Sequence, residues 1–141
     1  MIVLDASVAA KWFLPEIHAD EAQRLLSDGP GFLAPTLIRI EVAGAIVRRV
    51  RDDGMQEVEG RLACEKWQRL LETGPFELIP DAELFAVATD LAFKTRHTIQ
   101  DCLYLAASKI TGKPLFTADR KLAERGGKIV PMIHLLGSEH G

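Results

Sequence analysis

The sequence predicts an α/β protein built around a mostly parallel sheet of four to five strands. Apolar runs that are too short for helices alternate with longer amphipathic segments. Breakers rich in Gly, Pro and Asp, such as SDGPG at 27–31, separate these segments. No repeat or low-complexity tract interrupts the alternation. Strands that alternate with helices favour parallel pairing, because each helix returns the chain to the start of the next strand.

The short apolar runs are the predicted strands, and Pro131 places the last of them at an edge, since proline cannot donate to a strand ladder. These runs are 2–5 (IVLD), 32–35 (FLAP), 76–80 (FELIP), 115–119 (LFTAD) and 128–133 (KIVPMI). The amphipathic segments are the predicted helices, with Thr36 and Thr98 as caps. They cover 6–14, about 17–26, 36–51, 55–72, a segment that starts at Asp81, 98–110, and a short segment from Arg120 to 126.

Composition and charge limit the class of protein. A chain of 141 residues, 48% apolar and 26% charged, fits one globular domain over 1–141. A formal net charge of −3 argues against coating nucleic acid through bulk charge, although an enzyme could still contact it locally. No run is apolar and long enough for a membrane span, and the first residues lack a secretion pattern, so we expect a cytoplasmic protein. Cys64 and Cys102 are expected to be small buried thiols.

Asp5 and Asp119 each end a predicted strand. Ligand sites in parallel sheets lie beyond the carboxyl ends of the strands, so both carboxylates are expected at one edge. Each acid also has a structural explanation: Asp5 can cap the helix that follows it, and Asp119 or Thr117 can cap the next short helix. Neither acid alone decides between capping and chemistry, but a second acid at the same edge favours chemistry.

Asp101 and Glu41 are two further candidate acids. Asp101 lies three residues after Thr98, which resembles a capping box, and its charge suits the first turn of a helix. Glu41 lies in TLIRIEVAGAIV, where its neighbours three and four residues away carry no charge, so it needs a partner from outside its helix. That partner is either a bound ion or water, for which Gly44 leaves space, or a distant arginine.

Together the four acids predict a metal site. Carboxylates brought close together raise one another's pKa, and a divalent cation removes that repulsion. Oxygen ligands without His or Cys favour Mg²⁺ or Mn²⁺. In a chain without a nucleotide-binding loop, such a site favours phosphodiester hydrolysis, in which the metal polarises the phosphate and lowers the pKa of an attacking water.

Three features are distinctive in combination: IVLDASVAAKWF at 2–13, Glu41 within an apolar helix, and QDCLYLAASKITGKPLFTADRKL at 100–122. With these features and the intervals between them, nearly the whole chain resembles PIN-domain ribonucleases, specifically the VapC-type toxins of bacterial toxin–antitoxin pairs. The resemblance implies a PIN-like three-layer α/β/α sandwich and an endoribonuclease that depends on Mg²⁺ or Mn²⁺.

The resemblance also implies roles for individual residues and for partners. The metal-site and catalytic acids match Asp5, Glu41, Asp101 and Asp119. Of these, Asp5 and Asp101 match direct metal ligands, and Asp119 matches a residue whose contact can run through water. Thr117 and Ser7 match residues that support the site. The implied partners are an RNA substrate, a second copy of the chain, and an antitoxin whose C-terminal segment wraps the toxin and can place a basic side chain in the acid pocket.

Some of the other candidate residues keep two interpretations. Arg120 and Lys121 follow Asp119 and are candidates for RNA contact, or they serve solubility. Trp12, Phe13 and Leu14 form either a docking surface or part of the core. Helix-end positions explain the arginines at 48, 49 and 51 and also His97, while Tyr104 is expected in the core.

Competing functions differ in the acids that they require. A phosphatase of the haloacid dehalogenase type needs a second Asp two residues after Asp5, where this chain has Ser7. A phospho-acceptor receiver domain needs adjacent acids after its first strand, which are missing here. A catalytically inactive PIN-like module that binds RNA or protein has no reason to keep four acids that repel one another.

Overall fold

The sheet observed in the computed structural model has five parallel strands, and the predicted parallel α/β/α sandwich is confirmed. The structure describes residues 1–130 and 132–138. Its strands are β1 (Ile2–Leu4), β2 (Phe32–Pro35), β3 (Phe76–Ile79), β4 (Leu115–Thr117) and β5 (Ile133–Leu135). Their order across the sheet is β3-β2-β1-β4-β5, so β1 lies in the centre. In register, Val3 of β1 faces Leu33 on one side and Leu115 on the other.

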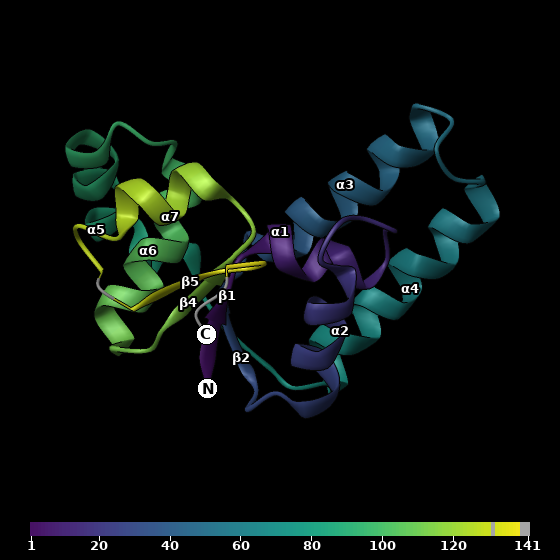
Figure 1. Cartoon of the computed structure of the whole chain (residues 1–141), viewed down its shortest axis with the longest axis horizontal. Helices are drawn as coiled ribbons and strands as arrows, with labels where there is room; N and C mark the ends of the chain where they lie inside the picture. Colours follow the sequence, from purple (N-terminus) through teal and green to yellow (C-terminus); the bar gives the residue numbers. More distant parts are fainter. Residues whose placement is uncertain (131, 139–141) are drawn as a thin grey trace.

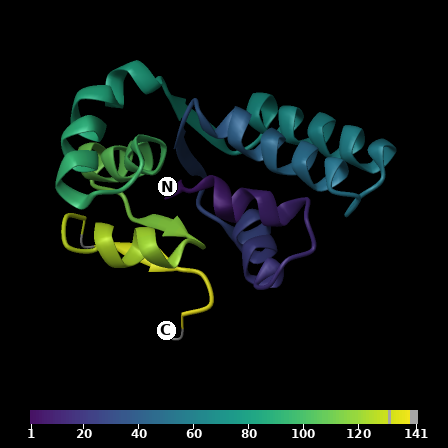
Figure 2. The ribbon, with the colours of Figure 1, turned by 90° about the horizontal axis from the view of Figure 1, so that it is seen from above.

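Helices cover both faces of this sheet. Those between β1 and β3 are α1 (Ala6–Ala9), the 3-10 helix η1 (Ala10–Trp12), α2 (Ala19–Asp28), α3 (Ile38–Arg51) and α4 (Glu57–Thr73). Those after β3 are α5 (Asp81–Thr95), α6 (Ile99–Thr111) and α7 (Arg120–Gly126). Figure 1 shows the first group on one side of the strands and the second group on the other. Viewed from above, α3 and α4 lie side by side and project from the body of the molecule (Figure 2).

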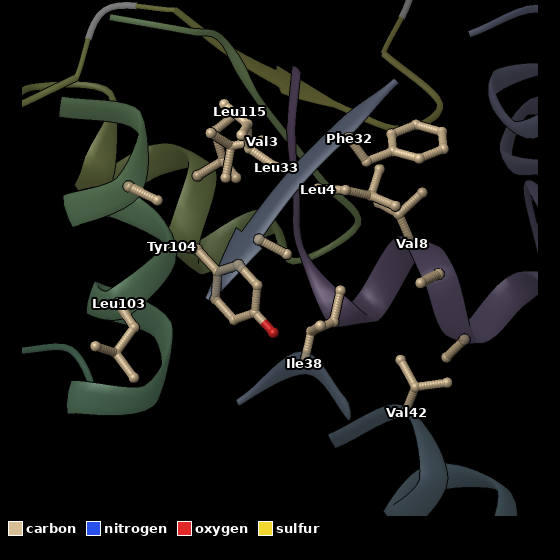
Figure 3. Packing of buried hydrophobic residues seen from close by; sticks show 14 of the residues in the cluster. Val3, Leu4, Val8, Phe32, Leu33, Ile38, Val42, Leu103, Tyr104 and Leu115 are labelled. Atoms are coloured by element: carbon tan, nitrogen blue, oxygen red, sulfur yellow. The ribbon is translucent and has the colours of Figure 1, made fainter. Parts of the chain in front are cut away.

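The core lies between the sheet and the inner faces of these helices. Val3, Leu4 and Val8 are fully buried, as is Phe32 of β2. In α6, every residue from Cys102 to Ser108 is buried, because that helix packs against the central strands. Figure 3 shows the Tyr104 ring among these side chains, with its hydroxyl pointing toward Ile38. One polar atom of the core is thereby directed toward α3.

The predicted helices over 6–14 and 36–51 differ from the observed ones for identifiable reasons. The helix expected over 6–14 is a short α1 followed by η1, because the Phe13 N–H donates to Ala10 O, three residues back. Thr36 does not cap α3: its N–H donates to Ile79 O of β3, which delays the helix to Ile38. The Thr36 hydroxyl instead accepts from the N–H of Asp81, whose carboxylate accepts from the N–H of Leu37. The Thr36 side chain thus caps the start of α5, and the Asp81 side chain caps the start of α3.

The prediction of a fifth strand at 128–133 is wrong in its position, because β5 covers Ile133–Leu135. The N–H groups of Ile129 and Val130 both donate to Gly126 O, which ties this segment to the end of α7. Val130 is buried there and cannot pair with β4. The strand is at an edge of the sheet as expected, whereas Pro131 lies outside the described residues.

Both cysteines are free, with Cys102 buried as expected and Cys64 only partly buried. Among the described residues, no helix combines the length and the apolar character that a membrane crossing requires.

Candidate metal centre

Asp5 lies between two neighbouring strands at their carboxyl ends. It follows β1, and Thr117 ends the adjacent strand β4. Its Oδ2 accepts hydrogen bonds from Ser7 Oγ at 2.6 Å and from Thr117 Oγ1 at 2.7 Å. Although Asp5 occupies the N-cap position of α1, its side chain makes no capping bond there. The capping alternative for Asp5 is therefore wrong, and its carboxylate belongs to a network of hydroxyls.

The backbone after β4 fixes both of these hydroxyls. The Ala118 N–H donates to Ser7 Oγ, and the Asp119 N–H donates to Thr117 Oγ1, each at 3.0 Å. Because each hydroxyl oxygen accepts from the backbone, its own hydrogen is free to point at Asp5. Thr117 is completely buried, so this support lies beneath the site. The two residues thus hold the Asp5 carboxylate in one orientation.

Glu41 reaches the site from α3 and has a partner that the sequence analysis did not name. The Tyr104 hydroxyl of α6 donates to Glu41 Oε1 at 2.6 Å. Burial of the Tyr104 ring confirms the prediction of a core residue, but the hydroxyl also contacts a site acid. The required partner from outside the helix is therefore neutral, and the predicted alternative of an arginine is wrong. A neutral donor leaves the Glu41 charge uncompensated.

Asp101, Asp119 and His97 form a third group of ligand atoms. Thr98 Oγ1 accepts from the Asp101 N–H at 3.2 Å, as the capping box predicted. Asp119 Oδ1 accepts from the Leu122 N–H at 3.2 Å, so this acid caps α7 and also faces the site. One ligand atom from each of the three residues lies within 4.8 Å of the others.

Sequence reasoning missed the contribution of His97. Its Nδ1 lies 3.0 Å from Asp101 Oδ2, and only 9% of its side chain is exposed. The i,i+4 spacing of His97 and Asp101 was a signal, but the two residues do not share a regular helix. Arg96 adopts a left-handed conformation between α5 and α6, and this turn places the imidazole against the carboxylate.

The four predicted acids line one open pocket of about 450 Å³. Ser7 and Gly44 line it too, and Thr117 lies below it. Arg120 and Lys121 are exposed but do not line the pocket. Arg48, which was assigned only to the end of its helix, does line it. The structure therefore brings the acids together but puts a different basic residue beside them.

Burial and mutual repulsion disfavour negative charge in this pocket. Burial raises the pKa of Asp5 to about 6, opposed by the hydrogen bonds from Ser7 and Thr117 and reinforced by Asp101 and Glu41. The pKa values of Glu41 and Asp101 are also raised, in both cases mainly by burial. The Tyr104 bond partly offsets the shift of Glu41, and His97 partly offsets that of Asp101. A cation at this position would remove the repulsion and restore the ionised forms.

The donor atoms fit a small divalent cation. Carboxylate oxygens are the ligands that Mg²⁺ and Mn²⁺ take in proteins, and they come here from four separate segments. The His97 nitrogen beside Asp101 and Asp119 adds a donor that suits a transition metal better than Mg²⁺. The fold and pocket together define a class: an α/β protein with an acidic cation site at the carboxyl edge of a parallel sheet.

Comparisons with known proteins agree with this class. The family model described as PIN domain matches residues 2–128. Ribonuclease VapC12 of Mycobacterium tuberculosis is 32% identical over 127 residues, which cover 90% of this chain and 93% of that protein. Ribonuclease VapC3 of Pyrobaculum aerophilum is 29% identical over 124 residues, 88% of this chain and 93% of that protein. The chain therefore belongs to the PIN-domain family and, within it, to the VapC-type ribonuclease toxins, as the resemblance predicted.

Proposed function

We propose that this protein is an endoribonuclease that uses Mg²⁺ or Mn²⁺ and acts in the cytoplasm as the toxin of a toxin–antitoxin pair. Asp5, Glu41, Asp101 and Asp119 are the proposed catalytic and metal-site residues. The observation that carries the proposal is the meeting of these four carboxylates in one pocket, where hydroxyls and His97 are their polar neighbours. Carboxylates that form no ion pair with Lys or Arg among the described residues are suited to a cation.

In the proposed mechanism, Asp5 and Asp101 would hold the cation directly, and Glu41 and Asp119 would complete the site, Asp119 through water. When bound, the divalent cation supplies polarisation of the scissile phosphate and a lower pKa for the attacking water. Ser7 and Thr117 keep Asp5 aimed into the pocket, and Tyr104 does the same for Glu41. His97 Nδ1 accepts from the Thr98 N–H and lies 3.0 Å from Asp101 Oδ2, which places the ring beside this acid. These neighbours act as the outer shell that fixes ligand geometry in metal sites.

The direct test is cleavage of RNA by the purified protein with Mg²⁺, with Mn²⁺ and with EDTA, beside Asp5→Asn and Asp101→Asn. Asparagine keeps the shape of each side chain and removes the charge. Cleavage that needs metal and that both substitutions abolish, in chains with an intact fold, is the expected result. RNA binding without cleavage would support the inactive PIN-like module instead. Hydrolysis of a phosphomonoester with no attack on RNA would support a phosphatase.

The proposed protein partner is a cognate antitoxin, and a groove of about 690 Å³ is its proposed docking surface. Trp12 and Phe13 line this groove together with apolar and charged residues of α4, including Leu62. Trp12 is also core, because its ring packs against Phe32 and its indole N–H donates to Ala22 O. Leu14 is buried and does not line the groove.

A charged side chain in this groove tests the antitoxin proposal. Leu62→Lys is expected to weaken antitoxin binding, because a lysine disrupts an apolar contact. Val58→Lys is the matched control: Val58 is exposed on the same helix but does not line the groove. Equal binding by both variants would place the antitoxin elsewhere. The proposed homodimer is tested separately by light scattering of the toxin alone at two concentrations.

A further inference from the structure

We propose that one face of α3 guides the RNA strand out of the acid pocket, with Arg48 bound to a backbone phosphate and Gly44 giving the strand room. This inference rests on the proposed ribonuclease function. Glu41, Gly44 and Arg48 are spaced by three and four residues, so they lie along one face of the helix. All three line the same pocket.

Gly44 leaves open space at the middle of this face. A Cβ atom built at Gly44 would meet no atom within 4 Å outside its own helix surroundings. Glycine inside a helix is destabilising relative to alanine, so its presence between Glu41 and Arg48 has no explanation in helix propensity. Close approach of a ligand to the backbone is one recognised reason for a glycine, and packing does not explain Gly44 because no atom beyond its own helix surroundings lies within 4 Å of its Cβ position. Ile40, 67% exposed, lines the pocket beside it and offers an apolar contact to a ribose or base.

Arg48 differs from the other arginines at the end of α3. Arg49 forms an ion pair with Glu16 at 3.0 Å, and Arg51 lines a different hollow between α3 and α4. Arg48 is exposed, lines the acid pocket, and forms no ion pair within residues 1–130 and 132–138. Its guanidinium is therefore available to a substrate.

The position of Arg48 favours a phosphate next to the scissile one. Seven residues of helix separate it from Glu41 by about 10 Å along the helix axis. An acidic pocket repels the phosphates of an approaching RNA, and a guanidinium at its rim offsets that repulsion with bidentate hydrogen bonds. Such a contact positions the strand without reading its sequence.

The experiment compares Arg48→Ala with Arg51→Ala on a short fluorescent single-stranded RNA. Cleavage is measured as kcat/KM over a range of salt, and binding is measured by anisotropy with Ca²⁺ in place of Mg²⁺. Arg48→Ala is expected to lower kcat/KM and RNA affinity about tenfold, and to reduce the slope of log affinity against log salt by about 0.7. Arg51→Ala is expected to leave all three unchanged, and Mn²⁺ affinity is expected to be unchanged in both variants.

Gly44→Leu tests the open space independently of charge. Its side chain is expected to lower RNA affinity and kcat/KM while Mn²⁺ affinity and melting temperature are retained, whereas Gly44→Ala is expected to have a much smaller effect. Equal losses in Arg48→Ala and Arg51→Ala, or none in Arg48→Ala, would overturn the inference even if the protein cuts RNA. Binding through Arg48 without any cleavage by the wild type would support the inference and overturn the ribonuclease proposal.

Discussion

The acid pocket and the Lys11–Glu16–Arg49 cluster both take residues from α3, but only the cluster pairs its carboxylate with cations. In the cluster, Glu16 lies between two cations, at 3.4 Å from Lys11 Nζ and 3.0 Å from Arg49 Nη2. In the pocket, no Lys or Arg within the described ranges forms an ion pair with any of the four acids. Paired charges stabilise one geometry, whereas unpaired carboxylates that are held by hydroxyls keep a position ready for a cation.

The largest expected effect comes from removing one pocket charge. Asp101→Asn should lower metal-dependent RNA cleavage more than about a hundredfold, because even the residues that support metal ligands can cost that much. The helix should remain capped, since the donor to Thr98 is the backbone N–H of residue 101. Cleavage assays with Mn²⁺ beside circular dichroism check both points. Cleavage by the variant near the wild-type rate would remove Asp101 from the site.

Asp5→Asn should stabilise the metal-free protein in a way that depends on pH. The raised pKa, about 6 against an ordinary 3.8, means that ionisation of Asp5 opposes folding. Well below pH 3.8 the carboxyl is protonated in both states. As the pH rises from 3.8 to 6, the folded state loses up to about 3 kcal/mol relative to the unfolded state, and the loss stays constant at higher pH. In EDTA at pH 8 the variant should therefore unfold at higher denaturant than the wild type, and the difference should disappear near pH 3.5.

Added Mn²⁺ is expected to reverse the order of stability of the wild type and Asp5→Asn, and this measurement is the control. The wild type should gain stability with Mn²⁺, since a ligand bound only to the folded state stabilises it. Asp5→Asn should gain much less. A variant that is less stable than the wild type in EDTA at pH 8 would show that the hydroxyl network needs a carboxylate.

Tyr104→Phe should have a smaller effect, confined to metal affinity. The substitution keeps the buried ring and removes the donor to Glu41 Oε1. That bond lowers the pKa of Glu41, so its loss should raise the pKa further and weaken Mn²⁺ binding about tenfold. Electron paramagnetic resonance of free Mn²⁺ measures the affinity directly. Cleavage should recover at saturating Mn²⁺; unchanged affinity would contradict a positioning role for Tyr104.

The smallest effect is expected from the paired cluster. Arg49→Gln removes one of the two partners of Glu16, and such partly exposed pairs contribute about 0.5 kcal/mol. Urea unfolding should show a loss of that size, and RNA cleavage should be unchanged. A loss of cleavage comparable with that of Arg48→Ala would mean that the two regions are not independent.

The sequence predicts the start of a strand correctly where the whole apolar run pairs within the sheet. The first four strands begin where predicted. The runs of β1 and β2 are buried, whereas that of β3 is only partly buried at an edge of the sheet. The run at 128–133 looked equally apolar, but Val130 packs at the end of α7 and the strand begins only at Ile133. Periodicity cannot distinguish a residue that covers a helix end from one that pairs with a strand.

The acids of the site were predictable and most of their neighbours were not. Asp5 and Asp119 follow from their places at strand ends, and Glu41 from its apolar surroundings. Tyr104 supports Glu41 from 63 residues away, and nothing local in the sequence joins the two. The position of His97 depends on the left-handed backbone conformation of Arg96. Glycine or asparagine is the usual sequence signal for that conformation, and neither stands at this position.

The bond between Thr117 and Asp5 has a consequence for synthesis of the chain. Its two ends are 112 residues apart, and the hydroxyl that holds the first acid is among the last parts of the sheet to be translated. A nascent chain on the ribosome has β1 and Asp5 long before it has β4, Thr117 and Asp119. The acid centre therefore cannot be complete until residues 115–119 have been translated.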